Sequence, residues 1–169
     1  EIEKSQALSL ADLLQGESGL EFGRNGGPGT TTSFFLRGQE SKNVVLMVDG
    51  VRAQTDGIGA LQITDLPLYQ IDRIEILRGN ASALYGESAI GGVIQIFTRK
   101  GEGVPKAYGA LSAGSYGSVG LSAGYGGSLG DYNFDISAGK NRRDGFSAMK
   151  TEQKTRANPD RDGFSTESF

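Results

Sequence analysis

The sequence predicts a chain in two parts: a small mixed α+β domain with long loops over residues 1–100, and antiparallel β-strands over residues 101–169. In the first part, short helix and strand signals alternate with glycine-rich loops. In the second part, polarity alternates with a period of two residues. Glycine accounts for 27 of the 169 residues, about 16% against a usual ~7%. One continuous core is therefore not expected.

The first element expected is a short helix that starts at Ser9. Asp12 follows Ser9 by three residues, and the apolar residues that come next lie on one helical face. This is the pattern of a capping box. The helix is expected to end near Gly16 or Gly19.

Strands and one further short helix are expected in the rest of the first part. Residues 44–48 form a continuous apolar run that Asp49-Gly50 closes, which predicts a strand buried on both faces and then a turn. A strand over residues 71–78, a short helix over 82–85 and a strand over 93–98 follow. The expected order is helix, strand, strand, helix, strand.

Two glycine-rich segments, residues 24–32 and 54–60, separate these elements and cannot pack a core. Long loops without structure usually either serve a function or are disordered. Two interpretations stay open for them: loops that present a binding surface, or solvated connections.

After Lys100, apolar residues alternate with small or polar ones. The apolar positions are Val119, Leu121, Ala123 and Tyr125 in one segment, and Tyr132, Phe134, Ile136 and Ala138 in the next. Residues 107–114 follow the same rule less cleanly, and a long charged loop is expected over residues 140–162. Two architectures fit: a water-soluble sandwich that buries the apolar face, or a transmembrane barrel that turns it to lipid.

Composition excludes several classes of function. The chain has no Cys and no His, so thiolate and imidazole catalysis and Cys/His zinc sites cannot be built. With 17 Lys and Arg against 20 Asp and Glu, there is no basic excess to bind nucleic acid. No apolar run approaches the ~20 residues of a transmembrane helix. Nothing places two carboxylates at the separation a glycosidase needs, so we expect no enzyme.

Four strings before Lys100 stand in a characteristic order: FFLRG at 34–38, VVLMVDGVR at 44–52, IDRIEILRGNASALYG at 71–86 and AIGGVIQI at 89–96. Together they resemble the plug domain of TonB-dependent outer-membrane receptors. The rest of the chain resembles the first strands of the attached barrel. Within the family, NGGPG at 25–29 and DRDGF at 160–164 are most similar to the cobalamin-receptor type.

The resemblance implies a fragment of a plugged 22-stranded barrel in the bacterial outer membrane. Such a receptor binds a scarce nutrient, a cobalamin-like corrinoid, an iron–siderophore or haem, and gates its uptake into the periplasm. TonB is expected to bind an amino-terminal segment that precedes Glu1, and outer-membrane lipid to surround the barrel. No cofactor is required. The alternative is a soluble β-rich surface adhesin or interaction domain.

The resemblance also implies site residues. By position in the cobalamin-receptor type, the plug contacts its ligand at Thr31, Ser33, Glu40, Ile58 and Gly59. Glu40 departs from the uncharged amide usual there, which puts corrinoid specificity in question.

Charged residues beside apolar strand positions form a second candidate set. Arg37, Glu75 and Arg78 are expected to pair between plug and barrel wall, because a half-paired buried charge costs several kcal/mol. The alternative is that Arg73, Glu75 and Arg78 are solvated strand ends.

Asp160 and Asp162 form an Asp-x-Asp-Gly sequence at the end of the long loop, and carboxylate oxygens suit Ca²⁺. The resemblance matches them to calcium ligands in the first external loop. It places a third ligand near Ser147, where Asp144 is the candidate substitute. A solvated turn is the alternative.

Overall fold

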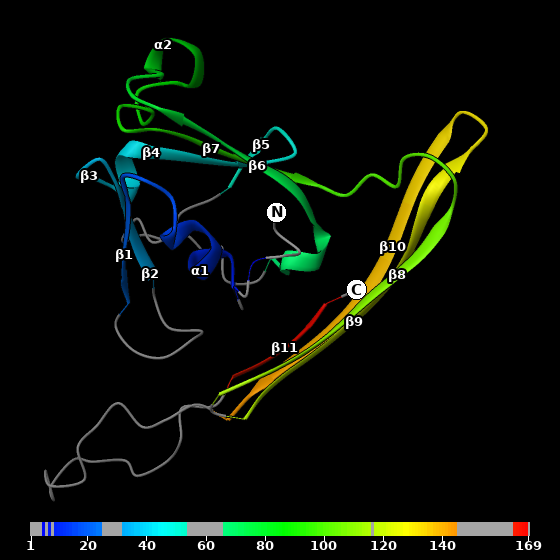
Figure 1. Ribbon diagram of the computed structural model, residues 1–169. Helices are drawn as coiled ribbons and strands as arrows, with labels where there is room; N and C mark the ends of the chain where they lie inside the picture. Colours follow the sequence, from blue (N-terminus) through cyan, green and yellow to red (C-terminus); the bar gives the residue numbers. More distant parts are fainter. Residues whose placement is uncertain are drawn as a thin grey trace, which may run out of the picture. The chain divides into compact units, whose positions relative to one another are not determined.

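The computed structural model describes residues 5, 7, 9–24, 32–53, 66–115, 117–144 and 164–168. They fall into two compact units, one that ends at Arg99 and one that begins at Lys100 (Figure 1). Within the described part of the chain, no helix is long and apolar enough to cross a membrane.

A four-stranded sheet in the order β5-β4-β7-β6 organises the first unit. β4 (Val44–Val48) pairs in parallel with β7 (Gly92–Thr98). β6 (Ile71–Arg78) and β5 (Val51–Arg52) lie antiparallel on the two flanks. The strands expected at 44–48, 71–78 and 93–98 are therefore confirmed.

Both predicted helices are present. α1 (Leu10–Gln15) begins after Ser9, whose Oγ accepts a hydrogen bond from the Asp12 backbone N–H at 3.2 Å. The Ser9 hydroxyl in turn donates to Asp12 Oδ2 at 2.7 Å, and the helix ends at Gly16. α2 (Ser82–Tyr85) ends at Gly86, whose φ of +88° favours glycine.

A second, three-stranded sheet was absent from the predicted order of elements. It consists of β1 (Leu20–Arg24), β2 (Thr32–Leu36) and β3 (Gln39–Glu40), joined as antiparallel neighbours. Two 3-10 helices, η2 (Ser41–Asn43) and η3 (Leu68–Gln70), precede β4 and β6. These strands have two to five residues, too few for a periodic pattern to appear in the sequence.

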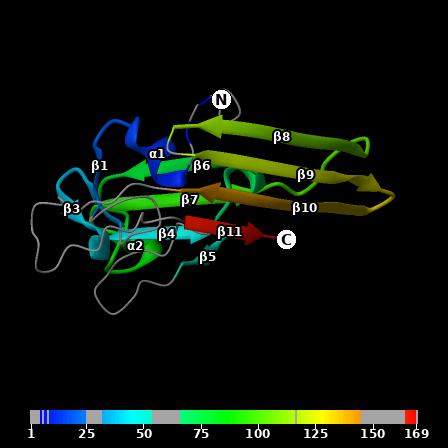
Figure 2. The ribbon, with the colours of Figure 1, turned by 90° about the horizontal axis from the view of Figure 1, so that it is seen from below.

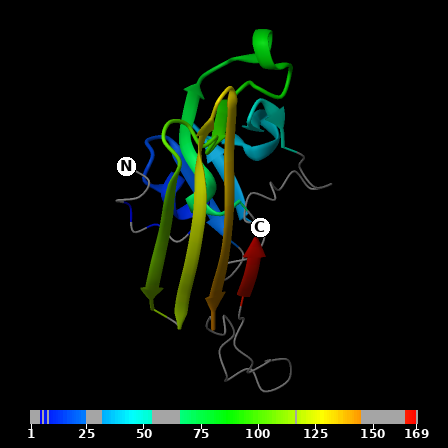
Figure 3. The ribbon, with the colours of Figure 1, turned by 90° about the vertical axis from the view of Figure 1, so that its right-hand side faces the viewer.

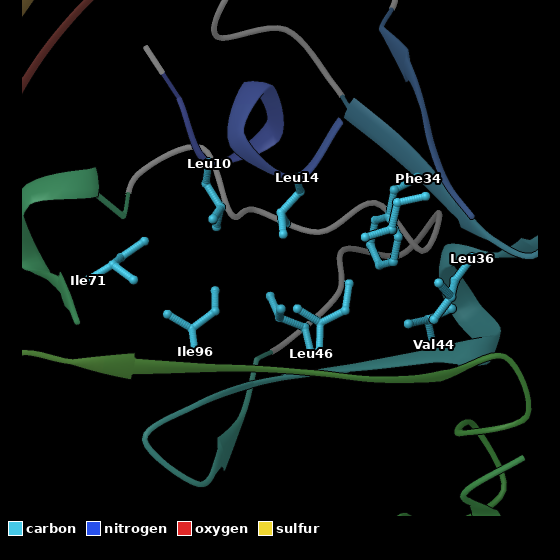
Figure 4. Close-up of a cluster of buried hydrophobic side chains, with 10 residues drawn as sticks. Leu10, Leu14, Phe34, Leu36, Val44, Leu46, Ile71 and Ile96 are labelled. Atoms are coloured by element: carbon cyan, nitrogen blue, oxygen red, sulfur yellow. The ribbon is translucent and has the colours of Figure 1, made fainter. Parts of the chain in front are cut away.

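The main core of the first unit lies where α1, β2 and the four-stranded sheet meet (Figure 4). Its buried members are Leu10, Leu14, Leu20, Phe34, Leu36, Val44, Leu46, Ile71, Ile94 and Ile96. A second cluster contains Val45, Ala81, Ala89 and Val93. Successive residues of β4 thus enter two different clusters, which explains its uninterrupted apolar run.

The second unit is an antiparallel sheet in the order β11-β10-β9-β8 (Figures 2 and 3). Its strands are β8 (Lys106–Gly114), β9 (Ser118–Leu129), β10 (Tyr132–Arg143) and β11 (Phe164–Ser168). One expectation was wrong: residues 140–143 belong to β10 and not to the long loop. They extend the strand because β11 pairs with them, with Lys140 opposite Glu167 in an ion pair.

The two faces of this sheet differ in the way the period-two pattern predicts. Apolar side chains are exposed along β8, β9 and β10, with Leu111 78% and Ile136 72% accessible. On the opposite face of β9, Ser118, Gly120 and Ser122 are buried. The larger apolar groups of this sheet therefore face outward, the reverse of a sheet that covers a water-soluble core.

The core predicts a large effect of truncation at β7. Ile96→Ala removes a fully buried side chain from the main cluster, so we expect a loss of about 2–5 kcal/mol in unfolding free energy. Amide hydrogen exchange of β7 measures this loss. Leu84→Ala is the control, since Leu84 is 82% exposed and its truncation should change little. Equal effects of the two substitutions would contradict the assigned core.

Candidate ligand-binding surface

The three-stranded sheet turns one face away from the core. Side chains directly opposite each other in an antiparallel pair share a face, and β1 pairs Gly23 with Ser33 and Glu21 with Phe35. Phe35 is in turn opposite Glu40 on β3. These five residues, Glu21, Gly23, Ser33, Phe35 and Glu40, are called the outer face below. On the other face of β1 and β2, Leu20, Phe34 and Leu36 belong to the main core, and Phe22 packs against it.

The outer face brings together two of the five predicted ligand residues, Ser33 and Glu40. The other three, Thr31, Ile58 and Gly59, lie outside the described residues. Glu21 and Phe35 were missed by sequence reasoning, because only the strand register places them beside Ser33 and Glu40. A Cβ added at Gly23 would meet no described residue within 4 Å, and Gly23 is exposed, so the sheet is accessible next to Ser33.

Glu40 is an exposed carboxylate beside a cationic side chain. Its Oε2 lies 2.7 Å from Lys42 Nζ, and both side chains are more than half exposed. An exposed pair of this kind contributes only about 0–1 kcal/mol to stability. The carboxylate is therefore accessible to a ligand at little cost.

The predicted ion-pairing residues have different surroundings. Arg78 Nη2 lies 3.1 Å from Glu17 Oε2, and Arg78 Nε donates to the Ser18 carbonyl at 3.2 Å. Arg37 occupies the β2–β3 turn with a φ of +52° and forms no ion pair with a described residue. Its backbone N–H donates to the Gly19 carbonyl at 2.7 Å.

Glu75 accepts a hydrogen bond from Arg73 Nε at 2.9 Å. That bond, with the charges of Glu75 and Asp72, raises the pKa of Arg73. The Arg73 guanidinium also lies 3.8 Å from the centre of the Phe97 ring. Glu75 and Arg78 thus have partners within the first unit, and pairing with a barrel wall stays a prediction.

One contact missed by sequence reasoning fastens the end of β7. Asp49 has a φ of +48°, and its carboxylate accepts hydrogen bonds from the Thr98 backbone N–H at 2.9 Å and the Thr98 hydroxyl at 2.6 Å. The Asp49 N–H donates to the Ile96 carbonyl at 2.9 Å. The turn expected at Asp49-Gly50 therefore also holds the last residue of β7, next to the boundary of the unit.

A polar bridge crosses the middle strand of the second unit. Tyr108 on β8 donates a hydrogen bond to Asp135 Oδ1 on β10 at 2.6 Å. Gly124 faces Tyr108, and Gly126 faces Asp135, in the register of β9. A Cβ at either glycine would overlap the side chain opposite, so these glycines make room for the bridge.

The predicted calcium ligands Asp160 and Asp162 lie outside the described residues. Within the part of the chain that the structure describes, no group of three or more acidic residues could hold a metal ion.

Comparison with known proteins gives the family. Residues 1–93, more than half of the chain, match the family described as TonB-dependent Receptor Plug Domain. The chain belongs to this plug-domain family. The resemblance found in the sequence is thereby confirmed. The predicted location of the chain, the bacterial outer membrane, is also confirmed, because TonB-dependent receptors are outer-membrane proteins.

Relatives of this plug-domain chain include vitamin B12 transporters. The transporter BtuB of Vibrio cholerae is 43% identical over 99 residues, which are 59% of this chain and 16% of the transporter. BtuB of Photobacterium profundum is 37% identical over 151 residues, 89% of this chain and 25% of the transporter. The chain thus spans a quarter or less of these two relatives.

Solved structures with this plug-domain fold include siderophore receptors. The ferric yersiniabactin uptake receptor FyuA of Yersinia pestis has a TM-score of 0.70 and 23% identity, over 99% of this chain and 26% of the receptor. The pyoverdine outer membrane receptor FpvA of Pseudomonas aeruginosa has a TM-score of 0.70 and 19% identity, over 82% and 20%. The relatives are transporters and receptors, and the comparisons favour this class over a soluble adhesin.

The polar bridge generates a prediction for the second unit. Gly124→Val would displace Tyr108 and break its bond to Asp135, so we expect faster amide exchange in β8–β10 and a loss of about 1–3 kcal/mol. Ala123→Val is the matched control, because Ala123 is the adjacent residue and is exposed on the opposite face. Equal exchange in the two variants would show that the bridge contributes nothing.

Proposed function

We propose that the chain is the plug, residues 1–100, and the first barrel strands, residues 101–169, of a TonB-dependent outer-membrane transporter for a cobalamin-like corrinoid. The observation that carries the proposal is the 43% identity with a vitamin B12 transporter over 99 residues. The siderophore receptors with a similar fold are 19–23% identical, which supports the fold and leaves the ligand to be tested.

The exposed apolar face of β8–β10 supports a place for these strands in a lipid-facing wall. Transmembrane barrel strands turn apolar residues to lipid and polar or small residues to the lumen. β8–β10 likewise expose apolar residues on one face and carry small or polar residues on the other. A barrel of 22 strands has a lumen wide enough to hold a plug. TonB would act on an amino-terminal segment of the complete receptor and open the path to the periplasm.

Ser33 and Glu40 on the outer face would contact the ligand, together with Thr31, Ile58 and Gly59. A corrinoid carries amide groups, which donate hydrogen bonds to the Glu40 carboxylate and the Ser33 hydroxyl. Hydrogen bonds to a charged acceptor are the stronger kind. Transport requires no covalent step, and selectivity would come from these contacts.

Ligand protection of the complete receptor tests the proposal. Cyanocobalamin is expected to raise its melting temperature, since a ligand at one hundred times its Kd stabilises the native state by about 2.7 kcal/mol. Haemin and a ferric siderophore are measured in parallel and should have no effect. Stabilisation by either of these and not by cyanocobalamin would reassign the ligand.

We further propose that Asp160 and Asp162 hold Ca²⁺ in the first external loop, with Asp144 as a third ligand. Asp144 also lies 3.4 Å from Arg142 Nη2, so binding would compete with this pair. Calorimetric titration of the complete receptor should detect Ca²⁺ binding, which Asp160→Asn with Asp162→Asn removes. The control is Asp131→Asn, since Asp131 lies in the β9–β10 turn outside this loop. Unchanged binding in the double variant would exclude the site.

A further inference from the structure

We propose that the buried hydroxyl of Ser41 is a positioning group for the ligand surface, and that it sets Ser33 and Glu40 in place relative to each other. The inference rests on the proposed function, in which Ser33 and Glu40 contact the ligand. Ser41 itself is only 7% exposed, so it would act through its neighbours and not by touching the ligand.

Ser41 forms two hydrogen bonds with the backbone of one residue on the neighbouring strand. Its Oγ accepts from the Phe34 N–H at 3.0 Å and donates to the Phe34 carbonyl at 2.8 Å. Both bonds are buried, and the Phe34 side chain is a member of the main core. One hydroxyl therefore satisfies both backbone groups of a buried residue.

These two hydrogen bonds extend the β2–β3 pairing by one residue beyond the point where the backbone of β3 ends. β3 pairs Gln39 with Leu36 and Glu40 with Phe35, so that Ser41 is the next residue in register with Phe34. At Ser41 the chain turns instead into η2, and β3 ends. The side chain then takes over the donor and acceptor roles that a strand would supply, and the turn toward β4 leaves no buried backbone group of Phe34 unpaired.

The position of this hydroxyl decides the geometry of both ligand residues. The Phe34 N–H belongs to the peptide group that joins Ser33 to Phe34, so the hydrogen bond that it donates to Ser41 Oγ orients this peptide. On its other side Ser33 is paired with Gly23 of β1. Glu40 precedes Ser41 in the chain, and its carboxylate pairs with Lys42. Ser33 and Glu40 lie on different strands. Ser41 connects them, because it is covalently joined to Glu40 and hydrogen-bonded to the backbone of Phe34, the residue after Ser33.

Removal of the hydroxyl should therefore reduce affinity for ligand as well as stability. Without it, the buried Phe34 N–H and carbonyl lose their partners, and the middle of β2 must move or admit water. Such a movement separates Ser33 from Glu40 and weakens any ligand that contacts both.

The test compares variants of the complete receptor by equilibrium binding of cyanocobalamin. Ser41→Ala is expected to raise Kd on the order of tenfold, the equivalent of one hydrogen bond. Ser41→Cys is the second variant, for use if the alanine variant does not fold. Cysteine has a similar shape but is a weak donor and acceptor, so this substitution should also raise Kd. Ser41→Thr keeps the hydroxyl and should restore binding. Faster exchange of the Phe34 amide in the alanine and cysteine variants should accompany the loss.

Val45→Ala is the control for stability alone, because Val45 is buried in the other cluster and not in the main core that contains Phe34, the partner of Ser41. It should lower the melting temperature and leave Kd unchanged. A Kd within twofold of wild type for both Ser41→Ala and Ser41→Cys would overturn the inference, and so would an equal rise of Kd in Val45→Ala. If the wild-type receptor binds no cyanocobalamin, the proposed function fails, and the positioning role falls with it.

Discussion

The parallel pairing of β4 with β7 is the constraint on which the first unit depends. Both strands are buried at their centre, and their side chains enter the two clusters on the two faces of the sheet. β5 and β6 attach to their flanks, and α1 with β2 closes one face (Figure 4). Parallel strands need a crossover connection, and here it contains β5, β6 and α2. Loops in this small domain are therefore confined to positions that keep the pairing of β4 with β7 intact.

The second unit obeys a different constraint, because its long strands have no apolar cluster of their own among the described residues. Backbone pairing and small side chains replace a core. Gly124 and Gly126 leave space in which Tyr108 reaches Asp135 across β9, so that three strands are tied by one side-chain hydrogen bond. Polar groups bond within the sheet on one face, while the other face keeps its apolar side chains exposed. Such a division suits an environment in which apolar surface does not need to be hidden from water.

The candidate ligand surface combines a rigid backbone with groups that stay accessible. The inner side chains of β1 and β2 are anchored in the core, whereas Glu21, Phe35 and Glu40 stand on the opposite face. Fixed backbone beneath exposed polar groups reduces the entropy lost when a ligand binds. A hydroxyl at Ser41 is well suited to this purpose because it ends the ladder without leaving an unpaired group, and so allows the chain to turn immediately after Glu40.

Local signals in the sequence were enough for α1, α2, β4, β6, β7 and the alternating strands after Lys100. The Ser9–Asp12 cap and the apolar run of β4 depend on residues a few positions apart, and the resemblance of four short strings gave the family. The three-stranded sheet, the face shared by Ser33 and Glu40 and the bonds of Asp49 to Thr98 depend on partners far away in the chain. Strands of two to five residues are too short for an alternation of polar and apolar residues to show which face is buried. Only the pairing of strands in three dimensions decides the face on which each side chain lies.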